Sequence, residues 1–392
     1  MTPGMFSGRG AEIMAIEQAL FQTRNGNPQH FLIHGERGIG KSSLLFYVDR
    51  LARGAIKVPE MGAFSFLTIN LDMESSHTYG DVILRIASEL RRQIASHQPA
   101  AELMKTVWDF AKRFEVKGVK YSPASGGPDA SELLEELTFA IAKTVERLSP
   151  AIDGIVVLID EADKAPAAQL GEFVKHFTER LTKRGCNQVC LGVAGISSIL
   201  SQMRESHESS LRIFQIFTLE PLLPHERVRV LQAGLADAEE VNQQKTSITP
   251  EAEALISDLS EGYPHFIQQF AFCAFDSDSD GVIDEPDVQV GASHPDKGAL
   301  QQLGLKYFYE LYFDQIGSDE YRSVLRGMAE HLDGWVRKSD LRKQLDIKDS
   351  TLNNAIAALK KRHIILAKPG VSGAYRLPTK SFAVWIRASF RS

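Results

Sequence analysis

The stretch His34–Tyr47, HGERGIGKSSLLFY, constrains the fold of this chain more than any other. Its glycines, lysine and serine follow the spacing G-x-x-x-x-G-K-S, between an apolar run that predicts a strand and an apolar periodicity that predicts a helix. Glycines allow backbone N–H groups to turn towards one point, and the helix N-terminus adds the positive end of its dipole. The stretch therefore predicts a phosphate-binding loop rather than a flexible turn.

A nucleoside triphosphate suits this loop because each residue type has a defined task. Lys41 is expected to reach the β- and γ-phosphates, and the hydroxyl of Ser42 is expected to bind Mg²⁺. The remaining residues contribute their backbone to the cradle. The predicted nucleotide-binding residues of the loop are Gly35, Glu36, Arg37, Gly38, Ile39, Gly40, Lys41, Ser42 and Ser43.

A second apolar segment ends in carboxylates, in the stretch GIVVLIDEADK from Gly154 to Lys164. Cleavage of a bound triphosphate needs a metal anchor and a group that orients water. We expect Asp160 to hold the Mg²⁺ ion and Glu161 to act as the general base. Alone, an acidic strand end also fits a solvated turn. Behind a phosphate-binding loop it indicates a hydrolytic site.

Strands and helices alternate through roughly the first half of the chain. Apolar runs predict five buried strands, and amphipathic segments between them predict crossover helices. This alternation is typical of an α/β fold with a parallel sheet. One helix is expected to run from Pro166 to Lys183, with the proline in its first turn. A small hairpin is expected within residues 113–128.

Composition narrows the class of protein. The three cysteines, Cys186, Cys190 and Cys273, form neither a disulfide framework nor a paired zinc motif, which favours a reduced, cytoplasmic setting. No apolar run approaches the ~20 residues of a membrane span, and no signal peptide is visible. We therefore expect no membrane association.

Three further stretches resemble one family across nearly the whole chain. FSGRGAEIMAIEQAL near the N-terminus, ESSLRIFQIFTLEPLLPHE and SEGYPHFIQQF are similar to segments of AAA+ ATPases, within the group of Orc/Cdc-type initiators and STAND-like ATPases. The resemblance implies an AAA+ nucleotide-binding domain over 1–220, a helical lid over 221–297 and a winged-helix domain over 298–392. It also implies ATP as the nucleotide.

The same resemblance assigns further residues to the site. Arg9 would flank the adenine, and Pro264 and His265 would approach the nucleotide from the lid. Arg212 would act as an arginine finger or sensor on the γ-phosphate of a neighbouring subunit, and Ser197 is a weaker sensor candidate. A surface salt bridge for Arg212 and a helix-start role for His265 remain open alternatives.

Charge is unevenly distributed along the chain. Residues 319–392 hold 15 lysines and arginines against 7 aspartates and glutamates, a net +8, whereas the rest of the chain carries −14. The pattern of this segment resembles a winged helix. Either duplex DNA or an acidic protein surface would suit it. The candidate DNA-binding residues are Asn353, Asn354, Lys360 and Lys361 on the second helix of a helix-turn-helix, with Lys368 and Arg376 on the wing.

An acidic stretch, DSDSDGVIDEPD from Asp276 to Asp287, resembles a calcium-binding loop. Its last position is Asp287, where such a loop uses a bidentate glutamate. A solvated acidic turn before a helix is the favoured alternative.

Together these features predict an ATP-binding and ATP-hydrolysing AAA+ switch. It would couple its nucleotide state to assembly of a homo-oligomer and to engagement of DNA or a partner protein. The alternative is a nucleotide-gated STAND-like signalling module with little turnover.

Overall fold

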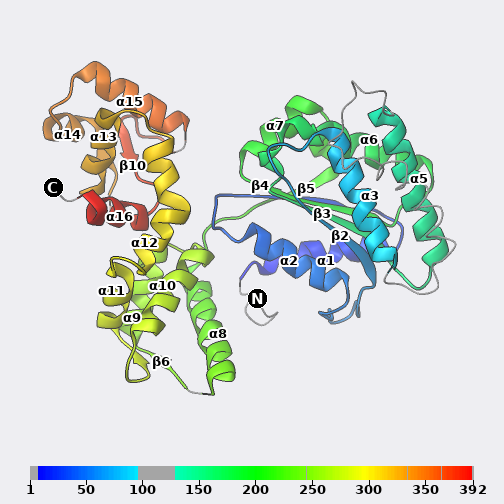
Figure 1. The fold of residues 1–392 in the computed structure, drawn as a ribbon, viewed down its shortest axis with the longest axis horizontal. Helices are drawn as coiled ribbons and strands as arrows, with labels where there is room; N and C mark the ends of the chain where they lie inside the picture. Colours follow the sequence, from blue (N-terminus) through cyan, green and yellow to red (C-terminus); the bar gives the residue numbers. More distant parts are fainter. Residues whose placement is uncertain (1–7, 96–128, 244, 333, 363, 391–392) are drawn as a thin grey trace. The chain divides into compact units, whose positions relative to one another are not determined.

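The computed structural model describes residues 8–95, 129–243, 245–332, 334–362 and 364–390 of the 392-residue chain (Figure 1). The hairpin expected within 113–128 lies outside these residues. The chain divides after Glu220 into two compact units, called here the N-terminal unit and the C-terminal unit. The three-domain division at 220 and 297 stays a prediction.

The N-terminal unit is built on a parallel five-stranded sheet, as the sequence predicted. The strands are ordered β2-β3-β4-β1-β5, and every neighbouring pair is parallel. Each strand coincides with one of the apolar runs. Their bounds are β1 His30–His34, β2 Phe66–Asp72, β3 Gly154–Asp160, β4 Val189–Gly195 and β5 Phe214–Thr218.

Helices cover both faces of this sheet (Figure 1). Alternate strand residues point to opposite faces, so Leu67 and Ile69 pack with α3, whereas Thr68 faces α2. Helices α1 (Gly10–Arg24) and α2 (Lys41–Ala52) lie on one face. The other face carries α3 (Tyr79–Ala95), α5 (Ala130–Leu148), α6 (Leu170–Lys183) and α7 (Ser198–Ser206).

The segment from Pro166 to Lys183 is not one helix, contrary to the sequence-based expectation. Residues Pro166–Ala168 form a 3₁₀ turn, η4, and α6 begins only at Leu170. Gln169 between them is left-handed, with φ of 46°. This conformation ends the helical hydrogen-bonding pattern, so the proline opens the turn and not the long helix.

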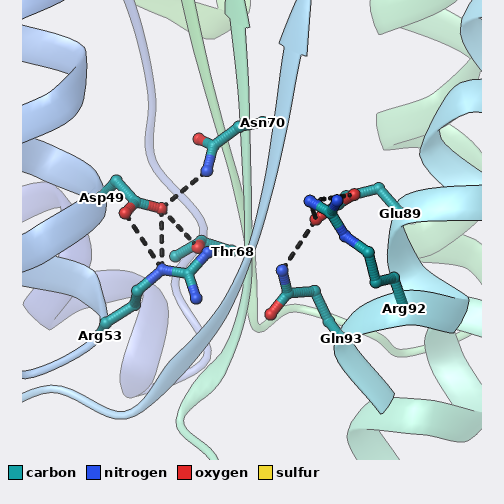
Figure 2. A network of polar contacts seen from close by, with 7 residues as sticks. All are labelled: Asp49, Arg53, Thr68, Asn70, Glu89, Arg92 and Gln93. Carbon is teal, nitrogen blue, oxygen red and sulfur yellow. Dashed lines mark hydrogen bonds and ion pairs between the residues drawn. The ribbon is translucent and has the colours of Figure 1, made fainter. Parts of the chain in front are cut away.

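One carboxylate fixes α2 to the sheet (Figure 2). Asp49 accepts hydrogen bonds from Thr68 Oγ1 at 2.6 Å and Asn70 Nδ2 at 2.8 Å on β2, and from Arg53 Nε at 3.0 Å. Figure 2 also shows Glu89 on α3, which accepts hydrogen bonds from Arg92 and Gln93. The Asp49 cluster matters for the site because α2 is the helix that follows the phosphate-binding loop.

The first half of the C-terminal unit is mainly helical. Residues Ser247–Ile248 and Val282–Ile283 add a minimal two-stranded sheet, β6 and β7. Its helices are α8 (Pro224–Asn242), α9 (Pro250–Ser260), α10 (Pro264–Ser277), α11 (Glu285–Ser293) and α12 (Ala299–Leu303), followed by the π-helical turns η6 (Gly304–Phe308) and η7 (Glu310–Asp314).

The second half of the C-terminal unit combines helices with a small three-stranded sheet, and its assignment as a winged helix stays a prediction. Three helices and three short strands alternate in the order helix, strand, helix, helix, strand, strand, and the strands form a sheet ordered β8-β10-β9. The elements are α13 (Asp319–Ala329), β8 (Val336–Arg337), α14 (Lys338–Gln344), α15 (Asp349–Lys361), β9 (Leu366–Ala367) and β10 (Ala374–Arg376), before a last helix α16 (Lys380–Phe390).

Replacing Asp49 with Asn should destabilise the N-terminal unit by about 1–3 kcal/mol at pH 7, because hydrogen bonds to a charged acceptor, including the bond from buried Thr68, are lost or weakened. Burial raises the pKa of Asp49, but the hydrogen bonds from Asn70, Thr68 and Arg53 outweigh it and lower the pKa overall. The stabilisation is therefore present above the unfolded-state pKa and is lost as the pH falls through the lower folded-state pKa.

Urea unfolding of both proteins between pH 7 and pH 3 measures this effect. The difference between wild type and Asp49→Asn should shrink below about pH 4. Glu146→Gln is the matched control, because Glu146 is an exposed helix carboxylate paired with Lys143 at 2.6 Å. A difference that does not depend on pH would contradict the assignment.

Candidate functional site

The glycines of the loop between β1 and α2 adopt conformations that other residues rarely reach. Gly38 and Gly40 are left-handed, with φ of 79° and 100°. A Cβ atom on Gly35 would lie 2.9 Å from the carbonyl oxygen of Leu219. Helix α2 starts at Lys41, and no side chain caps its first turn. The first N–H groups of α2 therefore lack side-chain partners at the carboxyl end of β1. This is the arrangement that binds an anion.

Lys41 folds back across this loop. Its Nζ atom donates to the carbonyl oxygens of Gly35 at 2.9 Å and Glu36 at 2.7 Å. Burial lowers the pKa of Lys41, and the negative charges of Asp160 and Asp163 partly oppose that effect. An ammonium group that is held by loop carbonyls and lies near carboxylates is positioned to exchange those carbonyls for phosphate oxygens.

Ser42 and Asp160 are brought together although 118 positions separate them in the sequence. The Ser42 hydroxyl hydrogen-bonds to the Asp160 carboxylate at the end of β3. Burial raises the pKa of Asp160, while this bond and a 2.7 Å bond from the Glu161 N–H act in the opposite direction. A hydroxyl beside a carboxylate is an all-oxygen donor set, which fits Mg²⁺.

Glu161 directly follows β3 in a left-handed conformation, with φ of 51°. Its carboxylate lies 2.5 Å from Lys164 Nζ, and both side chains are about half exposed. The turn therefore carries Glu161 away from the strand and leaves its carboxylate at the solvent-accessible edge of the sheet.

Asp163, which the sequence reading did not select, connects this turn to the next strand. Its Oδ1 atom accepts a 2.8 Å hydrogen bond from the N–H of Ile196, directly after β4. A Cβ atom on Gly195 would lie 2.9 Å from the same oxygen. The close approach of Asp163 thus accounts for the glycine at the end of β4.

Arg9 supports the phosphate-binding loop through a hydrogen bond to its backbone. Its side chain is only 8% exposed, and Nη2 donates to the carbonyl oxygen of Ile39 at 3.1 Å. Arg9 is itself left-handed, with φ of 63°, immediately before α1. The structure thus places this predicted adenine neighbour in contact with the backbone of the phosphate-binding loop.

Arg212 lies near the amino ends of strands β1 and β5, opposite the end that carries the phosphate-binding loop. It is exposed in the 3₁₀ turn η5 (Ser210–Ile213), which leads into β5. Because Phe214 pairs with His30 and Thr218 with His34, this turn lies beside the start of β1, whereas the phosphate-binding loop follows its end. The structure does not bring Arg212 to Lys41 of its own chain.

The remaining predicted residues belong to the C-terminal unit. Pro264 and His265 start α10, and the His265 ring lies 5.4 Å from the ring of Tyr307. Burial lowers the pKa of His265, and its Nε2 atom has no hydrogen-bond partner within the described chain. The six predicted DNA-binding side chains are all exposed, namely Asn353, Asn354, Lys360, Lys361, Lys368 and Arg376.

The acidic stretch Asp276–Asp287 joins α10 to α11. Its carboxylates bind their own backbone: Asp278 accepts from the N–H groups of Asp280 and Gly281, and Asp284 caps α11. In the parts of the chain that the structure describes, no cluster of three or more His, Cys, Asp or Glu side chains could hold a metal ion. This geometry fits an acidic turn that leads into a helix.

Comparison with known families and structures agrees with this geometry. Residues 5–191 match the family described as the AAA ATPase domain. Among solved structures, the Walker-type ATPase PABY2304 of Pyrococcus abyssi is 19% identical, with 97% of this chain and 96% of that chain covered and a TM-score of 0.57. The Aeropyrum pernix ORC2 protein, in ADPNP–ADP complexes, is 17% identical, with 97% and 92% covered and a TM-score of 0.58.

Two negative findings complete the comparison. None of the curated proteins matches the chain at a significant level. Among the described helices, none is long and apolar enough to cross a membrane.

Replacing Arg9 with Met should weaken nucleotide binding about three- to tenfold, because the loop loses a hydrogen bond worth about 1 kcal/mol. Titration with a fluorescent ATP analogue measures the change. Arg24→Met is the matched control: Arg24 Nη2 also donates to a backbone carbonyl, that of Met61 at 3.3 Å, but from the other end of α1. Equal losses in the two variants would show a general effect on α1 rather than support of the loop.

Proposed function

We propose that this chain, whose residues 5–191 match the family described as the AAA ATPase domain, is a P-loop ATPase that uses its nucleotide state to control assembly of identical subunits and engagement of DNA. The observation that carries the proposal is the convergence of Lys41, Ser42 and Asp160 at one edge of the parallel sheet. A loop that only capped a helix would not require the ammonium group and hydroxyl at the start of α2 to meet a carboxylate at the end of β3.

The residues divide the work of phosphate transfer to water. Backbone N–H groups of the loop and Lys41 bind the phosphates, and Arg9 keeps the loop in shape. Ser42 and Asp160 would hold Mg²⁺, which neutralises charge on the phosphates when bound. Glu161, as general base, takes a proton from the attacking water and orients that water towards the γ-phosphate.

The position of Arg212 favours action on a second subunit. It is exposed at the amino edge of the sheet and lies away from the phosphate-binding loop of its own chain. An arginine in this position can complete the site of a neighbouring copy, where its charge would stabilise the transferring phosphate. Assembly in the ATP state and hydrolysis would then be linked, because each site needs the neighbour.

The competing function is a nucleotide-gated binding module with little turnover. It uses the same loop, and it differs only in whether Glu161 activates water. The half-exposed carboxylate of Glu161, free of the Asp160–Ser42 pair, favours the hydrolytic role.

Glu161→Gln should retain ATP, but its hydrolysis rate should fall at least about 100-fold, because the amide cannot accept the proton of the water. Lys41→Ala should weaken nucleotide binding at least about tenfold, because a charge-assisted contact is lost. Phosphate release and nucleotide affinity, measured on both variants, separate the two steps. Should wild type and Glu161→Gln both retain ATP with no turnover, the gated-module function would replace the hydrolytic one.

DNA is the partner that the winged helix suits best. In α15, Leu352, Ile356 and Leu359 are buried, and this leaves the asparagines and lysines of the helix exposed. On the wing, Lys368 and Arg376 lie 5.9 Å and 5.2 Å from the Trp335 ring centroid. Together these side chains offer positive charge for phosphates and amides for base edges.

Binding of the full chain to duplex DNA should therefore weaken with salt. In the double variant Lys360→Ala/Lys361→Ala, the slope of log affinity against log salt should fall by about 1.8. Lys57→Ala/Lys183→Ala removes the same charge from exposed sites in the N-terminal unit and should leave the slope unchanged. Absence of binding at low salt would instead assign the basic winged helix to protein docking.

A further inference from the structure

His34 stands where three strands of the sheet end. It is the last residue of β1, directly before Gly35, and β1 lies between β4 and β5. The residue is 8% exposed. Its carbonyl oxygen also accepts a 2.8 Å hydrogen bond from the N–H of Leu219, directly after β5. The imidazole is therefore held at the base of the phosphate-binding loop.

Both ring nitrogens of His34 meet hydroxyl groups from the neighbouring strand ends. Nδ1 lies 3.4 Å from the Oγ atom of Ser197, two residues beyond β4. Nε2 lies 2.9 Å from Oγ1 of Thr218, the last residue of β5. The imidazole thus bridges the two strands on either side of the loop strand.

The hydroxyl of Ser197 does not cap the helix that follows it. Ser197 precedes α7, where a serine commonly caps the first turn, but its side chain makes no capping hydrogen bond. Ser197 is also exposed. The N–H of the preceding residue, Ile196, donates to Asp163, and the negative charge of Asp163 raises the pKa of Lys41. The hydroxyl is therefore held by His34 at the same edge of the sheet as the phosphate-binding loop.

A neutral imidazole imposes a direction on this chain of hydrogen bonds. One ring nitrogen donates and the other accepts. Burial lowers the pKa of His34, with Glu220 opposing and Lys41 adding to the effect, so the ring is neutral at pH 7. If Thr218 donates to Nε2, then Nδ1–H donates to Ser197, and the hydroxyl hydrogen of Ser197 remains available for another acceptor.

We propose that His34 is a positioning residue that directs the Ser197 hydroxyl to donate a hydrogen bond to the terminal phosphate of ATP. This inference rests on the proposed function, because it requires a triphosphate in the loop. The γ-phosphate is an acceptor only, so its arrival selects the arrangement in which Thr218 donates to His34 and His34 donates to Ser197. ADP lacks that acceptor and gains nothing from the relay.

The consequence is discrimination between ATP and ADP rather than a change in overall nucleotide affinity. A purely structural clasp between strand ends would affect both nucleotides alike, because both use the same loop. The ratio of the two affinities therefore distinguishes positioning from support.

Five variants of the full chain test the inference by titration with ADP and with a slowly hydrolysed ATP analogue. His34→Phe keeps an aromatic ring but removes both nitrogens, and it should weaken ATP-analogue binding about tenfold while ADP binding stays within twofold. Ser197→Ala should do the same. The double variant should lose no more than either single one, because both remove the same hydrogen bond to the phosphate.

The fourth and fifth variants separate the roles of the two ring nitrogens of His34. His34→Asn places an amide near the position of Nδ1 and should keep most of the ATP preference. His34→Gln places the amide near Nε2 and should lose it. Because Ser197 and Thr218 are both exposed, none of these changes leaves a buried hydroxyl unpaired, and thermal unfolding should confirm that each variant folds.

Two results would overturn the inference: parallel losses for ATP and ADP in His34→Phe, or equal behaviour of His34→Asn and His34→Gln. Lys41→Ala distinguishes this failure from failure of the proposed function. If Lys41→Ala abolishes nucleotide binding while His34→Phe keeps the wild-type ratio, only the role of His34 is wrong. If Lys41→Ala binds nucleotides as wild type does, the phosphate site itself is wrong.

Discussion

The backbone of the loop after β1 must hold several N–H groups towards one point without internal partners, and this requirement shapes the rest of the N-terminal unit. Such a loop is stable only when both of its ends are fixed. Its start is fixed because β1 is buried between β4 and β5, and its end is fixed because Asp49 binds α2 to β2. The left-handed glycines Gly38 and Gly40 then close the curve between them.

Features that carry a local motif of residue types could be predicted from the sequence. The loop, its lysine and serine, and the acidic end of β3 each combine a strand pattern with a residue type of known chemistry, so Lys41, Ser42 and Asp160 were identified as one group. The five strands were also predictable, because parallel strands with buried faces appear as largely apolar runs, although β5 is mostly exposed. Burial of one face of α15 also follows from the helical period of its apolar residues.

Contacts that depend on strand order could not be predicted in this way. His34 meets Ser197 and Thr218 only because β1 lies between β4 and β5, and no local pattern states that order. The contact of Asp163 with the end of β4 also depends on strand order, because β3 lies beside β4. The glycine at position 195 is consistent with this close approach. The long helix expected from Pro166 failed for a local reason, the left-handed Gln169, which has no sequence signature in a residue of that type.

The C-terminal unit is built so that helices α9 to α12 share one core with α16 and the helices and strands before it. The Phe308 ring of η6 contacts Phe266 of α10 at 5.8 Å and Phe382 of α16 at 5.2 Å. A Cβ atom on Gly304 would lie 2.1 Å from Trp385 Nε1, so the indole packs directly on the backbone there. Lys380, at the start of α16, also pairs with Asp258 of α9 at 2.8 Å.

This shared core limits how a nucleotide signal could reach the winged helix. A dense aromatic core transmits displacement because it cannot be compressed without loss of contacts. If nucleotide binding moves α10, where Pro264 and His265 lie, α16 has to follow together with the strands and helices packed on it. Motion of the C-terminal unit as one body therefore costs less than a rearrangement within it, and a switch of the proposed kind requires only that the nucleotide favour one position of that body over another.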